Sequence, residues 1–362
     1  MLRAYGQAFY DPVARECLAL THSVNKVRTI IVGTGGMARF HIQMMLKQQD
    51  TTEIVALCDP SPQQLALAVE LFEKNHLPVP TTGPELEPLL QELRGELDAA
   101  LIVTPHAYHF KQATACLESG LDVLLEKPMV MNARQARKLI KTTHATGRLL
   151  VVAFPGSLSP QIREAKRMLR EGQLGVLQSV NGFIWQNWKE NTVNTWRQVP
   201  KLAGGGFMFD TGAHLLNTTC DLVGEEFVEV AAWLDNRGAP VDIIGTVMAK
   251  TKSGVYVTMH GCGEAFNTYA SEIIAVGNKG LLRTGIWGER LEVQFGKPRS
   301  EGFKTKKIQL PPTLGVWEQF LDVRAGRMEN PCPPAVGLRM AKLWDAINAS
   351  AQQGGKPVTV KG

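Results

Sequence analysis

Between residues 26 and 152, two patterns of hydrophobic and polar positions alternate along the chain. Short apolar runs rich in β-branched residues are each followed by a stretch with helical periodicity. The pattern predicts buried strands at 27–32, 54–58, 99–103, 123–125 and 149–152, and helices at 37–47, 62–72, 85–93, 108–119 and 133–146. Regular alternation of strand and helix is typical of a parallel, doubly wound sheet, so we expect an N-terminal α/β domain of this class.

After residue 152 the pattern changes. One helix is predicted at 160–170, and strands then follow at 177–184, 228–233, 242–249, 255–259, 271–275, 290–294 and 306–310. Helices at 316–324 and 336–352 close the chain. Strands without intervening helices indicate an open, largely antiparallel sheet in a second α/β domain. We therefore expect an N-terminal extension at 1–25, a nucleotide-binding domain at 26–152, and a substrate-binding and oligomerisation domain at 153–362.

Composition narrows the class of protein. The chain has 362 residues, 44% of them hydrophobic and 20% charged, which suits a two-domain globular protein. A net charge of +5 without a basic run argues against nucleic acid, and no apolar stretch is long enough to cross a membrane. The six cysteines are scattered without a Cys-x-x-Cys motif, which favours a reduced, cytoplasmic protein. Residues 1–25 lack the apolar centre of a signal peptide.

The first candidate site is a small-residue turn between the first strand and the first helix. It comprises Gly33, Thr34, Gly35, Gly36, Met37 and Ala38. Such a turn allows a tight bend, close approach of a pyrophosphate, and close packing of helix on strand, and the helix N-terminus attracts the phosphates. The alternative is a strand-to-helix turn without a ligand. Asp59 ends the next strand, where a carboxylate can bind a ribose and repel a 2′-phosphate, so NAD is favoured and NADP remains possible.

Further candidates follow the later strands, because ligands of such sheets bind beyond the carboxyl ends of the strands. Thr104 and Pro105 end one strand, and His109 begins the next helix, where it either contacts the cofactor or caps and packs. Glu126 and Lys127 end another strand before a proline. We expect Lys127 to face the cofactor crevice, and the alternative for this pair is a surface ion pair.

Two segments of the second domain carry candidate chemistry. The amide-rich stretch 185–197 contains three tryptophans, of which Trp185 and Trp196, with Arg197, are candidates for binding a sugar. The alternative is that the indoles anchor the loop. Asp210 and His214 follow a glycine run and are four residues apart, a spacing that suits an oriented general base. The alternative is a buried capping pair, and two ligands are too few to predict a metal site.

Together these motifs resemble the glucose-fructose oxidoreductase and inositol dehydrogenase (Gfo/Idh/MocA) family. The resemblance runs from residue 26 to the end, through Gly33–Ala38, Thr104-Pro105 with His109, Glu126-Lys127-Pro128, Trp196-Arg197, and the glycine run with Asp210 and His214. The pattern Ala346–Ser350 also looks like the last helix of the family, whereas Asn217 stands where an acidic residue is expected.

The resemblance implies a Rossmann domain, an open-sheet domain, and a homodimer or homotetramer formed through that sheet. It implies hydride transfer between NAD and a carbon of a sugar, cyclitol or sugar derivative. Lys127, Asp210 and His214 would then surround the reacting hydroxyl, with His214 as base, Asp210 holding its ring, and Lys127 polarising the oxygen. Two alternatives stay open: a redox-neutral, lyase-like or glycoside-cleaving enzyme with tightly bound NAD, and a non-catalytic nucleotide-binding sensor.

Overall fold

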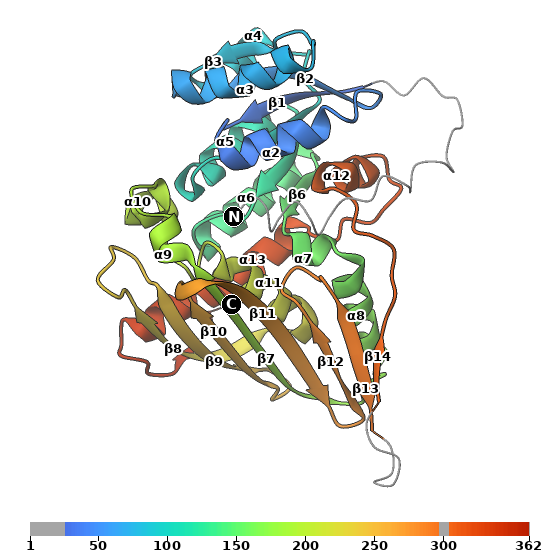
Figure 1. Cartoon of the computed structure of the whole chain (residues 1–362), viewed down its shortest axis with the longest axis vertical. Coiled ribbons are helices and arrows are strands. Elements are labelled where there is room, and N and C mark those ends of the chain that lie inside the picture. The colour runs from blue at the N-terminus through green and yellow to red at the C-terminus, as the bar shows by residue number, and fades with distance from the viewer. Residues whose placement is uncertain (1–25, 297–303, 362) are drawn as a thin grey trace. The chain divides into compact units, whose positions relative to one another are not determined.

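The computed structural model describes residues 26–296 and 304–361, which form two compact units (Figure 1). The first unit contains residues 26–129, Arg137–Ala153 and Leu314–Pro334. The second contains Val130–Ala136, Phe154–Thr313 and residues 335–361. The expected N-terminal extension, residues 1–25, lies outside the described residues, and the expected domain boundary at residue 152 stays a prediction.

A six-stranded, all-parallel sheet forms the centre of the first unit, in the order β3-β2-β1-β4-β5-β6. Its strands are β1 (Val27–Val32), β2 (Thr52–Cys58), β3 (Thr81–Gly83), β4 (Ala99–Ile102), β5 (Asp122–Glu126) and β6 (Leu150–Ala153). The helices are α2 (Gly36–Met45), α3 (Pro62–Lys74), α4 (Leu86–Glu92), α5 (His106–Glu118), α12 (Val316–Arg324) and, from Arg137 onward, α6 (Ala133–Thr146). The predicted doubly wound parallel sheet is confirmed. The short strand β3 was not predicted, because three residues are too few for a periodic signal.

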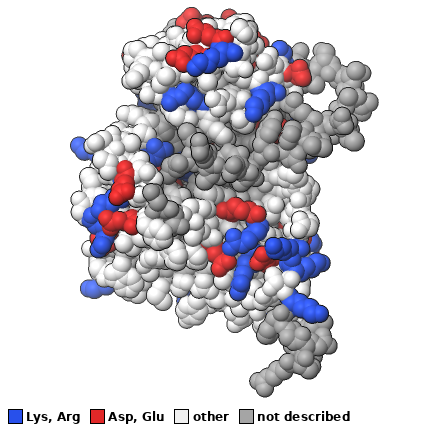
Figure 2. Space-filling model, viewed as in Figure 1, with Lys and Arg blue, Asp and Glu red and all other residues white. Residues whose placement is uncertain are grey.

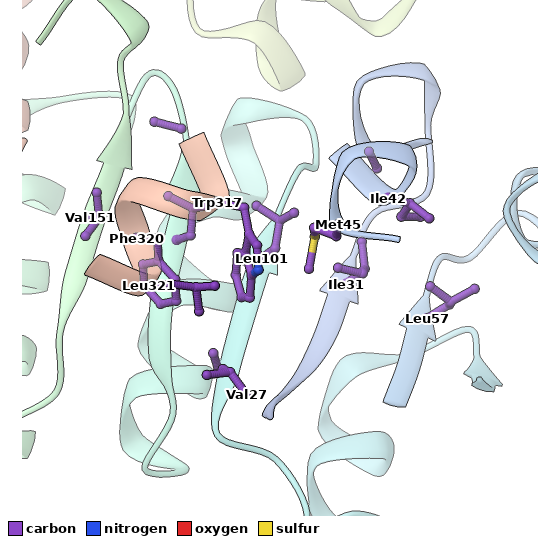
Figure 3. Packing of buried hydrophobic residues seen from close by; sticks show 14 of the residues in the cluster. Val27, Ile31, Ile42, Met45, Leu57, Leu101, Val151, Trp317, Phe320 and Leu321 are labelled. Atoms are coloured by element: carbon purple, nitrogen blue, oxygen red, sulfur yellow. The ribbon is translucent and has the colours of Figure 1, made fainter. Parts of the chain in front are cut away.

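Helix α12 packs into the core of the first unit although it is distant in sequence. Trp317 and Phe320 belong to the same buried cluster as Ile31, Leu57 and Leu101 of the strands, and Figure 3 shows Trp317 beside Leu101. The Trp317 indole N–H donates to Thr52 Oγ1 at 2.8 Å, which satisfies its buried polar group. The first unit therefore completes its core with residues that follow strands β7 (Leu177–Asn187) to β14 (Thr305–Lys307) of the second unit in the chain.

A nine-stranded sheet dominates the second unit, in the order β14-β13-β12-β11-β7-β10-β9-β8-β15. Its strands are β7 (Leu177–Asn187), β8 (Phe227–Asp235), β9 (Ile244–Thr251), β10 (Tyr256–Cys262), β11 (Glu264–Gly277), β12 (Gly280–Thr284), β13 (Leu291–Phe295), β14 (Thr305–Lys307) and β15 (Val358–Thr359). The β7–β10 pair is parallel and the other pairs are antiparallel. The predicted largely antiparallel sheet is confirmed, with β12 and β15 as strands that were not predicted.

The helices of the second unit hold its candidate site on one side of this sheet. They are α7 (Pro155–Leu158), α8 (Pro160–Arg170), α9 (Trp188–Asn191), the 3-10 helix η2 (Trp196–Gln198), α10 (Pro200–Ala203), α11 (Gly212–Val223) and α13 (Pro334–Ala351). Helix α11 packs on β7, β10 and β11, and α8 packs on β12 and β13 (Figure 1). Within the described residues, the helices are all too short or too polar to cross a bilayer.

Candidate active site

The small-residue turn of the first unit has the backbone geometry that close approach of a phosphate requires. Gly33 has a φ of +88°, and a Cβ there would lie 2.6 Å from the Val103 carbonyl oxygen, so only glycine fits. A Cβ on Gly35 or Gly36 would meet no described atom within 4 Å, which leaves open space in front of the N-terminus of α2. Ala38 is fully buried against the sheet. The turn therefore fits a dinucleotide pyrophosphate, which unpaired N–H groups at a helix start bind well.

Asp59 ties this turn to the end of β2. One carboxylate oxygen accepts the Thr34 backbone N–H at 2.8 Å, and the other accepts the Ser61 N–H at 2.9 Å. Each carboxylate oxygen can accept a further hydrogen bond. Asp59 thus fixes the small-residue turn and keeps acceptor capacity on both carboxylate oxygens.

His109 connects the residues that follow β4 with those that follow β5. Its side chain is fully buried, with Nδ1 2.8 Å from the Pro128 carbonyl oxygen and Nε2 2.9 Å from that of Thr104. Burial lowers the pKa of His109, although the two carbonyls and Glu126 act in the opposite direction. Thr104 also donates from Oγ1 to Gln112 at 2.5 Å, and Pro105 directly precedes α5. His109 therefore has the contacts expected of the capping and packing alternative. Its contact with the cofactor stays a prediction.

Glu126 forms a nearly buried pair with His41 of α2. The two side chains are 14% and 8% exposed, and His41 Nε2 lies 2.9 Å from Glu126 Oε1. The other carboxylate oxygen accepts the Lys127 backbone N–H at 3.0 Å, and the Lys127-Pro128 peptide is cis. Burial alone would raise the pKa of Glu126, but the hydrogen bond from His41 holds it below its ordinary value. The carboxylate therefore orients the backbone from which the Lys127 side chain projects.

The glycine run of the second unit is held by a carboxylate that the sequence did not single out. Asp242 accepts the backbone N–H groups of Gly206 at 2.6 Å and Met208 at 2.9 Å. A Cβ on Gly206 would lie 1.9 Å from the Asp242 carbonyl oxygen, so this close approach requires glycine. Burial raises the pKa of Asp242. The run therefore serves to bring the backbone before Asp210 against the β8–β9 connection.

Asp210 lies just before α11 and is buried, with 3% of the residue exposed. Its Oδ2 accepts a hydrogen bond from the Trp188 indole N–H at 2.8 Å and from Arg197 Nε at 3.0 Å. The Arg197 guanidinium also lies over the Trp196 ring, 4.6 Å from its centroid. The structure thus brings Asp210, Arg197 and Trp196 together, with Trp188 as the buried anchor.

His214 lies in the first turn of α11 and is 2% exposed. Its ring meets Phe154 edge-to-face at 6.0 Å and Trp287 at 5.5 Å between centroids. Trp287 in turn stacks on Tyr269 at 5.1 Å. Aromatic edges restrict the imidazole orientation and exclude water from it. Trp185 has a different setting, because it stacks on Phe183 of β7 and is 39% exposed.

Several residues that contact the predicted site residues, or the glycine run before Asp210, were not predicted: His41, Phe154, Trp188, Asp242 and Trp287. Each contacts a candidate from a distant position or another element, so no local spacing could reveal it. The signal for Trp188 was partial, since its indole belongs to the tryptophan-rich segment that the sequence marked.

Comparison with known protein families shows the family to which this chain belongs. Residues 27–154 match the oxidoreductase family with an NAD-binding Rossmann fold, GFO/IDH/MocA, and residues 162–283 match the C-terminal domain of the same family. The chain belongs to the GFO/IDH/MocA family. The resemblance seen in the sequence is thereby confirmed.

Individual relatives of this GFO/IDH/MocA protein carry names of dehydrogenases. Inositol 2-dehydrogenase 4 of Saccharopolyspora erythraea is 25% identical over 91% of this chain and 92% of its own length. Levoglucosan dehydrogenase of Pseudarthrobacter phenanthrenivorans is 29% identical over 40% of each chain. A solved structure of levoglucosan dehydrogenase in complex with NADH shares the fold, with a TM-score of 0.80 and 19% identity over 93% of this chain and 100% of that chain.

Proposed function

We propose that this GFO/IDH/MocA protein is an NAD-dependent dehydrogenase that oxidises a hydroxyl-bearing carbon of a sugar, cyclitol or sugar derivative. The observation that carries the proposal is the buried Asp210 carboxylate, ion-paired with Arg197 and four residues before the aromatic-enclosed His214. Buried titratable groups in such a pair suit proton transfer. The relatives named for inositol and levoglucosan support the substrate class.

The residues of the glycine-rich turn and Asp59 would hold the cofactor. When bound, NAD supplies the acceptor for the hydride that leaves the substrate carbon. The open space beside Gly35 and Gly36 and the N-terminus of α2 suit its pyrophosphate, and the Asp59 carboxylate suits an unmodified ribose. NADP is a weaker candidate because a 2′-phosphate would face that carboxylate.

The side chains divide the remaining work. His214 takes the proton of the substrate hydroxyl as general base, and Asp210 favours the protonated imidazole. Lys127 polarises the same hydroxyl oxygen and relays its proton. Arg197, which is bonded to Asp210, binds neighbouring hydroxyls, and Trp196 beneath its guanidinium binds the apolar sugar face. Trp185 adds a second indole to the substrate side.

The test is reduction of NAD+ across a panel of sugars, anhydrosugars, glycosides and cyclitols, with Lys127→Ala and His214→Ala beside the wild type. We expect turnover with some members of the panel and its loss in both variants, while bound NAD is retained. The matched control is Lys74→Ala, an exposed lysine of α3 that pairs with Glu70. Silence of the wild type across the panel, with NAD still held after purification, would instead support the redox-neutral or sensor function.

We also propose that the uncovered face of the nine-stranded sheet binds a second copy of the chain. Apolar side chains on that face, among them Trp233, Met248 and Tyr256, are between 51% and 60% exposed. Figure 2 shows charged side chains gathered in separate groups on the second unit, with largely uncharged surface between them. Exposed apolar area of this kind marks interaction surfaces. Sedimentation of the wild type and Trp233→Glu tests this, and a wild-type monomer contradicts it. We further propose that the protein is cytoplasmic.

A further inference from the structure

The stripe of α11 that begins at His214 carries a chain of buried polar groups. Asn217 and Asp221 follow His214 by three and seven residues, which places all three on one side of the helix. Asn217 is fully buried and Asp221 is 2% exposed. Polar groups buried this deeply need hydrogen-bond partners. The direction of each hydrogen bond in the series therefore shows which atoms still need a partner.

Asp221 forms the charged end of this chain. Its carboxylate accepts the Ser157 hydroxyl at 2.6 Å and ion-pairs with Arg339 at 2.6 Å and Lys166 at 3.3 Å. A carboxylate paired with two cations has oxygens that only accept hydrogen bonds. Ser157 therefore uses its single O–H on Asp221.

The direction of the bond from Ser157 to Asp221 determines the orientation of the Asn217 side-chain amide. Asn217 Nδ2 lies 2.7 Å from Ser157 Oγ, and the serine oxygen is left to accept because its proton is directed to Asp221. The amide cannot flip without placing two acceptors in contact. Asn217 Oδ1 is therefore held away from Ser157, and it has no hydrogen-bond partner within residues 26–296 and 304–361.

We propose that Asn217 is a positioning residue for His214, and that its Oδ1 accepts a hydrogen bond from the imidazole once His214 holds the substrate proton. The proposal rests on the proposed function. It gives a buried, oriented acceptor the donor that it lacks, supplied from one helical turn away. A neutral amide stabilises the imidazolium less than a carboxylate does, so the proton can leave again after turnover.

The charged groups around this side of α11 determine how strongly the Asn217 acceptor can affect the pKa of His214. Asp210 lies one turn before His214, and Asp221 is compensated by Lys166 and Arg339. In the loop that carries Trp287, Glu289 accepts the Trp287 backbone N–H at 3.2 Å. Because the charge of Asp221 is already paired with two cations, Asp221 acts on His214 only by orienting Ser157 and, through it, the Asn217 amide.

Two substitutions with opposite expected effects test the proposal. Asn217→Leu removes the acceptor, so the pKa of His214 falls and the acidic limb of kcat/KM moves to lower pH by about one unit. Asn217→Asp places a negative charge one turn from His214, so the limb moves to higher pH by about one unit or more. A structural role alone would weaken both variants without moving the limb in opposite directions.

The control and a second measurement keep the outcomes separate. Thr219→Val removes another buried α11 hydroxyl without a partner in the described part of the chain, and it should leave the limb unchanged. NMR titration of His214, assigned with His214→Gln, measures the same pKa shifts without turnover. An inactive wild type would reject the proposed function alone, whereas unmoved His214 titrations in both Asn217 variants would overturn this inference. An Asn217→Leu variant with raised KM and an unmoved limb would overturn it too and assign Oδ1 to the substrate.

Discussion

Trp188 donates its indole N–H to Asp210 at 2.8 Å, and the two side chains are buried together. The indole therefore stabilises the ionised carboxylate in a setting where water cannot replace it. Trp188 is 22 residues from Asp210 in sequence. This bond makes a tryptophan of the polar loop part of the support of the predicted active site.

Trp188→Phe should lower the free energy of unfolding by about 1.5–3 kcal/mol, because a buried carboxylate loses one of its donors. Urea denaturation at pH 7 measures the change. Tyr108→Phe is the control, since Tyr108 is 47% exposed on α5 and its substitution also removes one polar donor from an aromatic side chain. Equal stability of the two variants would show that the indole N–H contributes nothing to Asp210.

Asp59→Asn should raise the ratio of NADP to NAD use by at least about tenfold, which corresponds to roughly 1.4 kcal/mol. The substitution keeps the shape of the side chain but removes the charge that repels a 2′-phosphate. Kinetics with both cofactors measure the ratio. Glu53→Gln, an exposed change on β2, serves as the control, and an unchanged ratio in Asp59→Asn would exclude the carboxylate from cofactor discrimination.

His41→Leu should destabilise the protein by about 3 kcal/mol at pH 7, because Glu126 loses the partner of its buried charge. The pKa of Glu126 is held below its ordinary value of 4.5, so this stabilisation is present above pH 4.5 and is lost as the pH falls through the lowered value. The difference between variant and wild type should therefore shrink toward acidic pH. Unfolding at pH 7 and pH 4 measures it.

The control for this pH dependence is Lys74→Leu in the exposed Glu70–Lys74 pair. We expect little change at either pH, since exposed ion pairs contribute little. A difference for His41→Leu that stays constant between pH 7 and pH 4 would contradict a role of the Glu126 charge.

Trp317→Ala should cost about 3–5 kcal/mol, since it empties a fully packed position of the first unit and removes the bond to Thr52. Trp317→Phe isolates the hydrogen bond and should cost about 1 kcal/mol. Denaturation followed by circular dichroism measures both. A small effect of Trp317→Ala would mean that helix α12 is dispensable for the core that Figure 3 shows.

The sequence alone determined the fold class and the family, because both depend on local signals. Short apolar runs rich in β-branched residues, set between helical patterns, predicted the strands β1, β2, β4, β5 and β6, and small residues at fixed offsets predicted the phosphate-binding turn. Asp59, Lys127, Asp210 and His214 became candidates because each stands at a recognisable point, a strand end or a helix start.

Tertiary structure alone decided which groups support these residues. Trp317 enters the first core, Trp188 binds Asp210, His41 binds Glu126, and Asp242 binds the glycine run, each across a long separation in sequence. A buried polar group takes whichever partner the packed chain brings within hydrogen-bond distance, and burial itself arises only when distant segments meet. For this reason the spacing of residues along the sequence identified the candidate site residues, while only the folded chain showed which distant groups orient their side chains.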